Sequence, residues 1–543
     1  MKNGLHLRVP RQMLNAIIAL GITLCLNFPY FHHAYALVSP NNVHTWAFIL
    51  TMPWVSFFVL FSLLMLAELI GLAFPLAVIF ILLASSAQYF ISCYGIIVDR
   101  SMVANMANTT AAESFALLTP QLVGYFVLTA LIPIIVIFFA RRTTRQSYVS
   151  RLVSALLSVV MCAGGTYLIS NSFYKDYASL FRNNRELITY LSPSNGIAAA
   201  LSWYKHERTA NLPLIPFGTD AHPSTAYKTG KPLLTLLIVG ETTRAQDVGL
   251  GGYARQTTPL LAKDNVIYYP NTTSCGTSTA VSVPCMFSGM GREHYNDELA
   301  NHREGLLDIV QRAGVNVLWR ENDGGCKGAC SRVPTEEMTA QNLAGMCIDG
   351  ECYDQVLYHN LQRYIDKQTG NTLIVIHTIG SHGPTYNHRY PPQYAAYSPT
   401  CETNEVQHCS TEQLVNTYDN TVRYMDAMVD QGIHLLQANG QRFSTSLVYL
   451  SDHGESLGED GVYLHGLPYM VAPIQQKHVP LLIWLSDEYR RRYAIDQQCM
   501  LAQAKAMQSS QDNLFPTILG LFGIQTTTYQ PTADLLAGCR GKS

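Results

Sequence analysis

A long stretch with almost no charge constrains the fold of this chain more than any other feature of its sequence. Within residues 45–93, Glu68 is the only charged side chain. One helical crossing of a bilayer needs about 20 apolar residues, so this stretch predicts two crossings with a turn at residues 67–71. Three more apolar runs, at 13–31, 122–140 and 152–170, bring the predicted spans to five. We therefore predict a transmembrane domain of five helices over residues 1–170.

Basic residues beside these spans predict which end of the domain faces the cytoplasm. Lys and Arg are retained on the cytoplasmic side of a membrane, and the loop at 29–44 contains neither. An N-terminus in the cytoplasm and five spans place everything after about residue 171 on the opposite side. The basic residues precede the first span or separate the fourth from the fifth: Lys2, Arg8, Arg11, Arg141, Arg142, Arg145 and Arg151.

Cysteine usage supports that placement independently. Ten of the 13 cysteines follow residue 270, and eight of these stand in close pairs. In an oxidising compartment such a set predicts disulfides. A thiolate zinc site at Cys326 and Cys330 is the alternative, but this spacing has no matching Cys-x-x-Cys partner. The predicted pairs are Cys275 with Cys285, Cys326 with Cys330, Cys347 with Cys352, Cys401 with Cys409, and Cys499 with Cys539.

The remainder of the chain divides into a connection and a large domain. In residues 171–230, Phe173, Tyr177 and Phe181 recur at helical spacing beside basic residues. This pattern predicts a helix in the membrane interface followed by a linker, with a solvated helix packed on the later domain as the alternative. Over residues 231–543, strand-like runs alternate with helical patterns at 296–312 and 411–438. The alternation predicts a doubly wound α/β domain.

Acidic and imidazole side chains follow three of the predicted strands. Glu241 follows the apolar run 233–239, and Asp452 and His453 follow the run 446–450. A third run, 372–376, leads to His377 and His382. Active sites of open α/β sheets gather where such strands end, and carboxylate oxygen with imidazole nitrogen is a zinc-type ligand set. The sequence therefore predicts a metal site at one edge of the sheet.

A loop rich in hydroxyl groups offers a nucleophile. Residues 272–280 contain mostly Ser and Thr and precede the apolar run 281–287, which could open a helix whose N-terminal amides favour a phosphate. Composition alone does not choose among these hydroxyls, and turn or capping chemistry is the ordinary role of such a loop.

A second motif suggests a different nucleophile. Residues 454–458 read Gly-Glu-Ser-Leu-Gly, which matches the nucleophile elbow of serine hydrolases around Ser456. That elbow requires its serine at the strand-to-helix turn, whereas here three residues, 451–453, intervene. The order of serine, distant acid and then histidine is also poorly met by His465. A serine hydrolase is therefore not expected.

Five segments taken together carry a family resemblance. They are VGET at 239–242, SCGTSTAVSVPC at 274–285, SHGP at 381–384, SDHGESLGE at 451–459 and LHG at 464–466. With the five spans and the cysteine pairs, these segments resemble the lipid A phosphoethanolamine transferases, the family of the mobile colistin-resistance enzymes. The resemblance implies a soluble domain of the alkaline phosphatase type, and a multi-pass protein of the bacterial inner membrane whose catalytic domain lies in the periplasm.

The resemblance also implies roles for particular residues. Thr279 is implied to be the nucleophile, and His382 and His465 are implied to contact the substrate phosphate, to hold a second, looser zinc, or to act as general acid or base. Lys327 resembles a position near the donor headgroup, although this chain has Gly324 where some relatives carry a serine. The implied ligands of one tightly bound Zn²⁺ are Glu241, Thr279, Asp452 and His453.

Three polar residues of the membrane domain resemble positions that contact the lipid headgroup. Asn105, Thr109 and Glu113 stand at i, i+4 and i+8 and would share one face of a helix. A polar loop between spans is the equal alternative.

The implied reaction moves phosphoethanolamine from phosphatidylethanolamine to a phosphate of lipid A through a covalent Thr279 intermediate. It would release diacylglycerol and give resistance to polymyxin and other cationic peptides. Membrane lipids are the implied partners of a monomer, and a net charge of −2 with no basic run in the later domain argues against nucleic acid. A sulfatase is disfavoured because no Cys/Ser-x-Pro-x-Arg segment occurs. Phosphoglycerol transfer, a core-sugar or other periplasmic acceptor, and an inactive binding protein remain as alternatives.

Overall fold

The computed structural model describes residues 10–94, 98–99, 102–103, 120–140, 147–210, 212–348, 350–403, 406–467, 469–470 and 472–541. The chain divides into two units, Met1–Asn211 and Leu212–Ser543. Asn105, Thr109 and Glu113, expected to contact lipid headgroups, lie outside the described residues.

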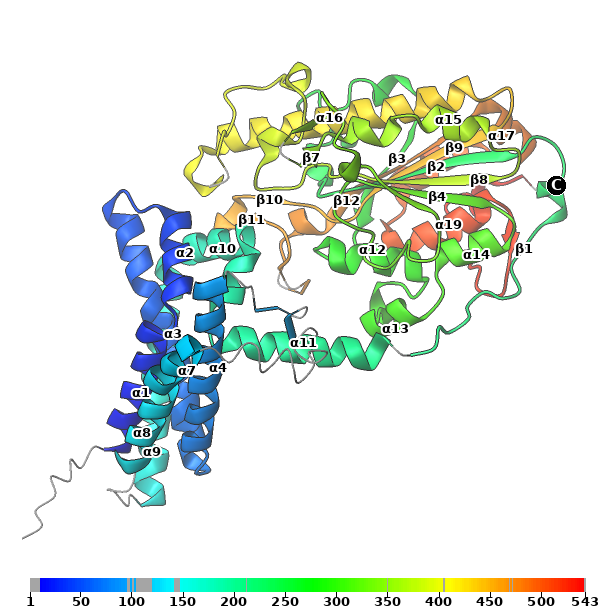
Figure 1. Cartoon of the computed structure of the whole chain (residues 1–543). Coiled ribbons are helices and arrows are strands. Elements are labelled where there is room, and N and C mark those ends of the chain that lie inside the picture. Colours follow the sequence, from blue (N-terminus) through cyan, green and yellow to red (C-terminus); the bar gives the residue numbers. More distant parts are fainter. Residues whose placement is uncertain are drawn as a thin grey trace, which may run out of the picture. The chain divides into compact units, whose positions relative to one another are not determined.

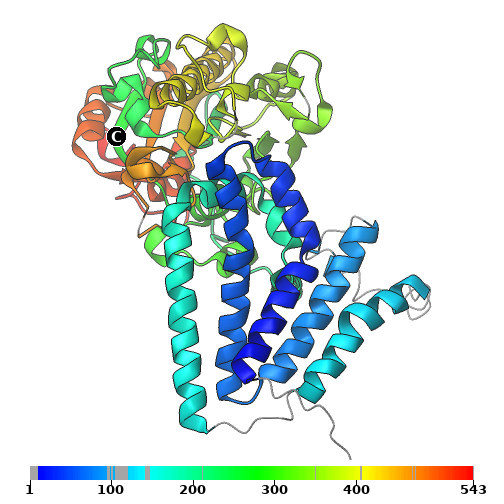
Figure 2. The same cartoon turned by 90° about the vertical axis from the view of Figure 1, so that its left-hand side faces the viewer.

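The first unit is built from long apolar helices that run side by side (Figures 1 and 2). Among the described residues, four are long and apolar enough to cross a membrane. They are α3 (Val43–Leu69), α4 (Ala73–Tyr94), the continuous stretch from α7 (Pro120–Phe126) through a π-helical turn (Val127–Leu131) to α8 (Ile132–Ala140), and α9 (Tyr148–Ser172). The turn between α3 and α4 centres on Gly71, with φ of +76°, inside the predicted 67–71.

The first predicted span, one helix over 13–31, is not a single helix in the structure. The structure has α1 (Arg11–Cys25) and α2 (Phe28–Val38), bent by 54°, and a fifth span exists only if this pair counts as one. The bend lies at Asn27, whose side-chain amide accepts from the Ser192 N–H at 2.7 Å and donates to the Ser192 carbonyl at 2.9 Å. The bend between α1 and α2 is therefore stabilised by a residue that lies 165 positions away in the sequence.

The single acid of the uncharged stretch has a partner in the same unit. Glu68 is buried near the end of α3 and forms an ion pair with Arg11 at the start of α1. Because an unpaired charge among apolar helices is costly, this pair explains why one acid is tolerated there.

The amphipathic helix after α9 is α10 (Tyr174–Asn183). Its apolar side chains pack in a cluster with residues of α2 and α3, and Tyr177 forms a 2.8 Å hydrogen bond with Thr51. A short 3₁₀ segment (Arg185–Tyr190) and α11 (Ser194–Ala210) complete this unit. The placement of α10 in the membrane interface stays a prediction.

The second unit is organised by one eight-stranded sheet. The strand order is β13-β3-β12-β9-β2-β8-β4-β5, and only β12 runs against its neighbours. The four consecutive strands β9, β2, β8 and β4 are parallel and almost wholly buried, as their continuous apolar runs predict. The strands are β2 (Leu233–Gly240), β3 (Ile267–Thr273), β4 (Asn316–Glu321), β5 (Thr335–Glu337), β8 (Thr372–His377), β9 (Ser444–Ser451), β12 (His478–Leu485) and β13 (Ser509–Ser510).

Helices cover both faces of this sheet, so there are two apolar cores (Figure 1). One core includes α12 (Thr279–Ser288), α14 (Leu306–Arg312), α17 (Asp487–Arg492), α18 (Gln497–Ala506) and α19 (Leu514–Leu521). The other includes α15 (Leu361–Asp366) and α16 (Thr411–Ala438). Short ribbons pair β1 (His222–Pro223) with β14 (Ile524–Gln525), β6 (Cys347–Ile348) with β7 (Glu351–Cys352), and β10 (Ser456–Leu457) with β11 (Tyr463–Leu464).

Of the two predicted helices, α16 has the predicted bounds, whereas 296–312 is wrong as one helix. It forms α13 (Asp297–His302) and α14, separated at residues 303–305. There the backbone bridges to Ile215, which donates to the His302 carbonyl at 2.7 Å. This strand-like contact removes residues 303–305 from the helix.

The ten cysteines that follow residue 270 form five disulfides, all in the second unit. The pairs are Cys275–Cys285, Cys326–Cys330, Cys347–Cys352, Cys401–Cys409 and Cys499–Cys539. These are the predicted pairs, so Cys326 and Cys330 are not thiolate metal ligands here.

Candidate active site

Adjacent parallel strands deliver the predicted acidic and imidazole groups to one edge of the sheet. Strand β2 lies between β8 and β9, with Gly240 opposite Ser451 and Val239 opposite His377. Glu241 therefore begins the loop after β2 just where Asp452 begins the loop after β9, and the Asp452 N–H donates to the Gly240 carbonyl at 2.8 Å. Strand register alone brings these carboxylates together from positions 211 residues apart in the chain.

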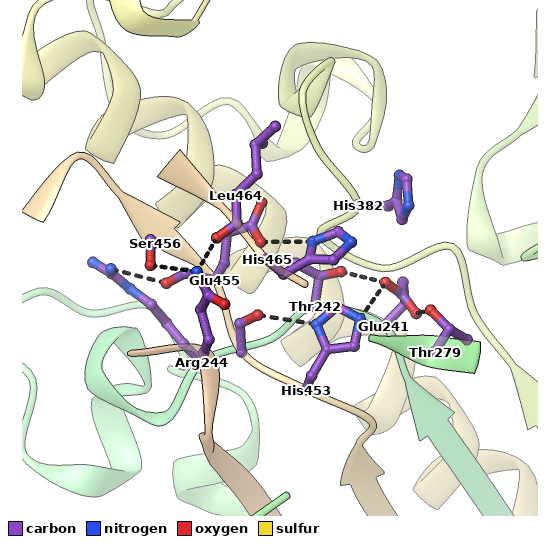
Figure 3. A network of polar contacts seen from close by, with 12 residues as sticks. Glu241, Thr242, Arg244, Thr279, His382, His453, Glu455, Ser456, Leu464 and His465 are labelled. Atoms are coloured by element: carbon purple, nitrogen blue, oxygen red, sulfur yellow. Dashed lines mark hydrogen bonds and ion pairs between the residues drawn. The ribbon is translucent and has the colours of Figure 1, made fainter. Parts of the chain in front are cut away.

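Glu241, Asp452 and His453 form a fully buried cluster, and Figure 3 shows Glu241 and His453 side by side. His453 Nε2 lies 3.3 Å from Glu241 Oε1 and 3.3 Å from Asp452 Oδ2. The other oxygen of Asp452 accepts from the backbone N–H groups of Thr242, at 3.1 Å, and His453, at 2.6 Å. The loop 378–381 closes against this cluster at Gly380, where a Cβ would lie 2.4 Å from the Glu241 carbonyl oxygen.

These residues fit a zinc ion. His453 Nδ1 faces the Gly454 carbonyl at 3.0 Å, which fixes the tautomer that leaves Nε2 with a lone pair. Within the described part of the chain, Asp452 Oδ2 and His453 Nε2 are buried without a hydrogen-bond partner. Burial lowers the pKa of His453, but the facing Asp452 and Glu241 outweigh it and raise that pKa to about 10. The cluster thus attracts positive charge and presents oxygen and nitrogen donors to it.

The structure distinguishes Thr279 from the other hydroxyls of its loop. Thr279 begins α12, and its Oγ1 donates to Glu241 Oε2 at 3.0 Å. Ser274 instead donates to the Gly276 carbonyl at 2.5 Å, and Thr277 donates to the Leu467 carbonyl at 2.6 Å. Among the loop hydroxyls with described hydrogen bonds, Thr279 is the one directed at the cluster.

Two histidines lie beside the cluster (Figure 3). The His465 ring is centred 4.3 Å from the His453 ring and 5.5 Å from the His382 ring. His465 Nδ1 bonds to Glu455 Oε2 at 2.8 Å, and the buried Glu455 also accepts from the Tyr386 hydroxyl. Burial lowers the pKa of His382 to about 4, so its ring is neutral at neutral pH.

Comparison with known proteins now decides the family. A profile described as "Phosphoethanolamine transferase EptA/EptB" matches residues 55–208, and one described as "Sulfatase" matches residues 234–524. Phosphoethanolamine transferase EptA of Salmonella typhimurium is 56% identical over 96% of this chain and 95% of its own. Phosphatidylethanolamine transferase Mcr-1 of Escherichia coli is 34% identical over 83% of both chains. This chain belongs to the EptA family of phosphoethanolamine transferases.

The fold agrees with a solved structure of that family. The integral membrane lipooligosaccharide phosphoethanolamine transferase A of Neisseria meningitidis superposes with a TM-score of 0.67 at 39% identity, covering 97% of this chain and 99% of the other. Its soluble domain alone gives a TM-score of 0.59 at 45% identity, covering 61% of this chain and 100% of that one. The second unit therefore has the fold of that soluble domain, over the region that the sulfatase profile matches.

Lys327 lies in the loop closed by the Cys326–Cys330 disulfide. Its side chain is exposed, and Nζ donates to the Gly324 carbonyl at 3.1 Å. The structure shows no contact between Lys327 and the carboxylate cluster among the described residues, so a role at the donor headgroup stays a proposal.

Ser456, the serine of the sequence that matches a nucleophile elbow, makes no hydrogen bond to a histidine that the structure describes. Ser456 is buried in β10, and its Oγ accepts from Gln476 Nε2 at 3.1 Å. Of the histidines near it in sequence, His465 bonds to Glu455, and His453 faces Glu241 and Asp452. The geometry therefore excludes a Ser-His pair at this motif.

Sequence reasoning missed several residues of this site. Glu455 and Tyr386 support His465, and Glu321 and Asp323 lie beside His377. Glu455 stands inside the quoted SDHGESLGE segment, so the motif itself was the available signal. For Glu321 and Asp323 there was none, because strand order is needed to bring β4 beside β8.

Proposed function

We propose that this protein transfers phosphoethanolamine from phosphatidylethanolamine to a phosphate group of lipid A. The observation that carries the proposal is the Thr279 hydroxyl, 3.0 Å from Glu241, at the start of α12 and beside a buried cluster of zinc-type donors. Family membership supports the phosphoethanolamine group. The lipid donor and the lipid A acceptor follow from the motif resemblance.

In the first half of the reaction Thr279 acts as the nucleophile. Its oxygen forms a bond to the phosphorus of phosphatidylethanolamine, and the bond from phosphorus to the glycerol oxygen breaks. Diacylglycerol leaves with a proton, and phosphoethanolamine stays on Thr279. Held by Glu241, Thr279, Asp452 and His453, a zinc ion would lower the pKa of the threonine hydroxyl and offset charge on the phosphoryl group.

In the second half a lipid A phosphate oxygen attacks the phosphorus of that intermediate. The bond from phosphorus to Thr279 breaks, and the threonine oxygen regains a proton. The reaction is a double displacement with a covalent intermediate.

The two histidines suit different proton roles. His382, with its pKa lowered to about 4, accepts a proton at neutral pH rather than supplying one. His465 faces the Glu455 carboxylate at 2.8 Å, which stabilises a positively charged ring. We therefore assign proton delivery to the leaving glycerol oxygen to His465 and proton acceptance to His382.

The cellular setting follows the same proposal. Apolar helices in the first unit, basic residues beside them and five disulfides in the second unit support an inner-membrane protein with its catalytic domain in the periplasm. The transferred amine adds a positive charge to lipid A, so cationic peptides such as polymyxins would bind the cell surface less strongly.

Intact-protein mass spectrometry tests the covalent step. The full chain in detergent is loaded with zinc and incubated with phosphatidylethanolamine, with Thr279→Ala beside it as the matched control. A phosphoethanolamine adduct on the wild type alone, with diacylglycerol released, is the expected result. Released diacylglycerol without an adduct would overturn the nucleophile assignment.

A second assay tests the acceptor. The adduct-bearing protein is mixed with lipid A or with a lipopolysaccharide core that lacks lipid A phosphates. Loss of the adduct only with lipid A, and a matching mass gain on lipid A, is expected. Transfer to the core sugars would replace lipid A as the acceptor.

A further inference from the structure

A second group of potential ligands lies on the other side of Glu241. Strands β2, β8 and β4 are consecutive in the sheet, and their ends carry Glu241, His377 and, two residues past β4, Asp323. One ligand atom from each of these three side chains lies within 4.8 Å of the other two. The group shares Glu241 with the zinc-type cluster but otherwise uses different residues.

His377 is oriented towards this group by a buried acid. Its Nδ1 bonds to both carboxylate oxygens of Glu321, at 2.9 and 3.0 Å. Glu321 is in turn held by the Trp319 indole N–H at 2.8 Å and the Asp323 backbone N–H at 2.6 Å. A carboxylate that fixes one ring nitrogen so that the other is free is the usual support of a metal-binding histidine.

The free nitrogen of His377 has no partner of its own. Nε2 is fully buried and makes no hydrogen bond to any residue that the structure describes. It lies 3.8 Å from Asp323 Oδ2. A buried polar atom in this state costs free energy unless a ligand satisfies it.

The negative charge at this edge of the sheet also favours a bound cation. Four carboxylates, from Glu241, Asp452, Glu321 and Asp323, lie at this edge of the sheet, each buried or nearly so. One divalent cation at the zinc-type cluster offsets two of these charges.

We infer that Glu241, Asp323 and His377 form a second binding site for a divalent metal ion, with Glu321 as a positioning residue for His377. Two carboxylate oxygens and one imidazole nitrogen suit zinc or manganese. The site is separate from His382 and His465, and the inference does not depend on the donor or the acceptor of the proposed reaction.

Metal stoichiometry tests the inference. The full chain in detergent is stripped with chelator, reloaded with Zn²⁺ alone or Mn²⁺ alone, and its metal content per chain is measured by native mass spectrometry. We expect two ions in the wild type, one in Asp323→Asn and one in His377→Ala. Asp366→Asn, which removes the charge of an exposed carboxylate paired with Arg442, is the matched control and keeps the wild-type number of ions.

Two outcomes would overturn the inference: one ion in the wild type at saturating metal, or a second ion that is lost from the double variant His382→Ala, His465→Ala but retained in Asp323→Asn. Because the buried variants can fail to fold, crystals of the wild type soaked in Zn²⁺ give an independent answer. An anomalous difference peak among Glu241, Asp323 and His377 is expected, and a map without this peak would also contradict the site.

Discussion

At the scale of single residues, the site depends on side chains that hold other side chains. His465 is held through Glu455, which Tyr386 also contacts, and His377 is held through Glu321. In both pairs the carboxylate is fully buried. A buried carboxylate fixes the orientation and tautomer of its histidine at low conformational cost, so removing its charge should affect catalysis more than folding.

Glu455→Gln tests this for His465. We expect kcat to fall by about 10–100-fold with little change in KM, because the ring loses its charged support but the substrate contacts remain. The pH dependence of kcat should also change, which a purely structural defect would not produce. Ser456→Ala, next in the chain and bonded to Gln476 rather than to His465, is the control and should keep kcat within about threefold of wild type. Unchanged kinetics in Glu455→Gln would refute the role.

Asp419 gives a prediction about pH and stability. Burial, then the nearby Asp247, raise the pKa of Asp419 to about 7, above the value of 3.8 for a free carboxyl. The folded state therefore binds this proton more tightly than the unfolded state does. Stability from this group is present below about pH 4 and is lost as pH rises through 7, by up to about 4 kcal/mol. Between pH 5 and 8 the melting temperature of Asp419→Asn should fall less steeply with pH than that of the wild type. Equal slopes in the two proteins would contradict the assignment.

At the scale of secondary-structure elements, the strand ends set the position of every cluster member. Asp452 and His453 lie in the turn after β9, and Gly454 is packed so tightly there that a Cβ would lie 2.0 Å from the Gln475 carbonyl oxygen. Backbone, not a flexible side chain, occupies that space. Any side chain at residue 454 must therefore move the turn that carries Asp452 and His453, two of the proposed zinc ligands.

Gly454→Ala should consequently lower both stability and zinc content. Overpacking of this kind costs about 1–3 kcal/mol, and the shifted turn should weaken zinc binding, measured as metal per chain after dialysis. Gly370→Ala is the matched control, because its Cβ would meet nothing closer than Asn316 at 3.7 Å. A Gly454→Ala protein with normal melting temperature and full zinc content would show that the turn adapts.

At the scale of the whole molecule, the two units are stabilised by different interactions. In the first, the buried Glu68 forms an ion pair with Arg11. The second combines two apolar cores with five disulfides. Four of these close loops of 4–10 residues, whereas Cys499–Cys539 closes a separation of 40. The long loop should contribute most to stability.

Replacing Cys499 and Cys539 together by Ser should cost about 4 kcal/mol of unfolding free energy, against about 2 kcal/mol for Cys326 and Cys330, from loop-closure entropy. Denaturant unfolding of the full chain in detergent, followed by near-UV circular dichroism, measures the difference. The two double variants change the same number of cysteines, so each controls for the other. An equal loss in both would mean that native-state packing, not loop length, dominates.

Local patterns in the sequence determined much of this protein. Apolar runs gave the membrane helices and the buried strands, cysteine spacing gave the disulfide pairs, and helical periodicity gave the bounds of α16, because each signal lies within one continuous segment. The motif resemblance brought Glu241, Thr279, Asp452 and His453 together as an expectation. Their burial and contacts are what the structure adds.

Tertiary structure alone decided the features that depend on distant partners. The bend at Asn27 needs Ser192, and the break between α13 and α14 needs Ile215. In the Ser/Thr-rich loop, Thr279 is distinguished from the other hydroxyls by its hydrogen bond to Glu241. The group of Glu321, Asp323 and His377 exists only because β4 lies beside β8. Strand order is set by packing across the whole sheet, so no window of sequence contains it.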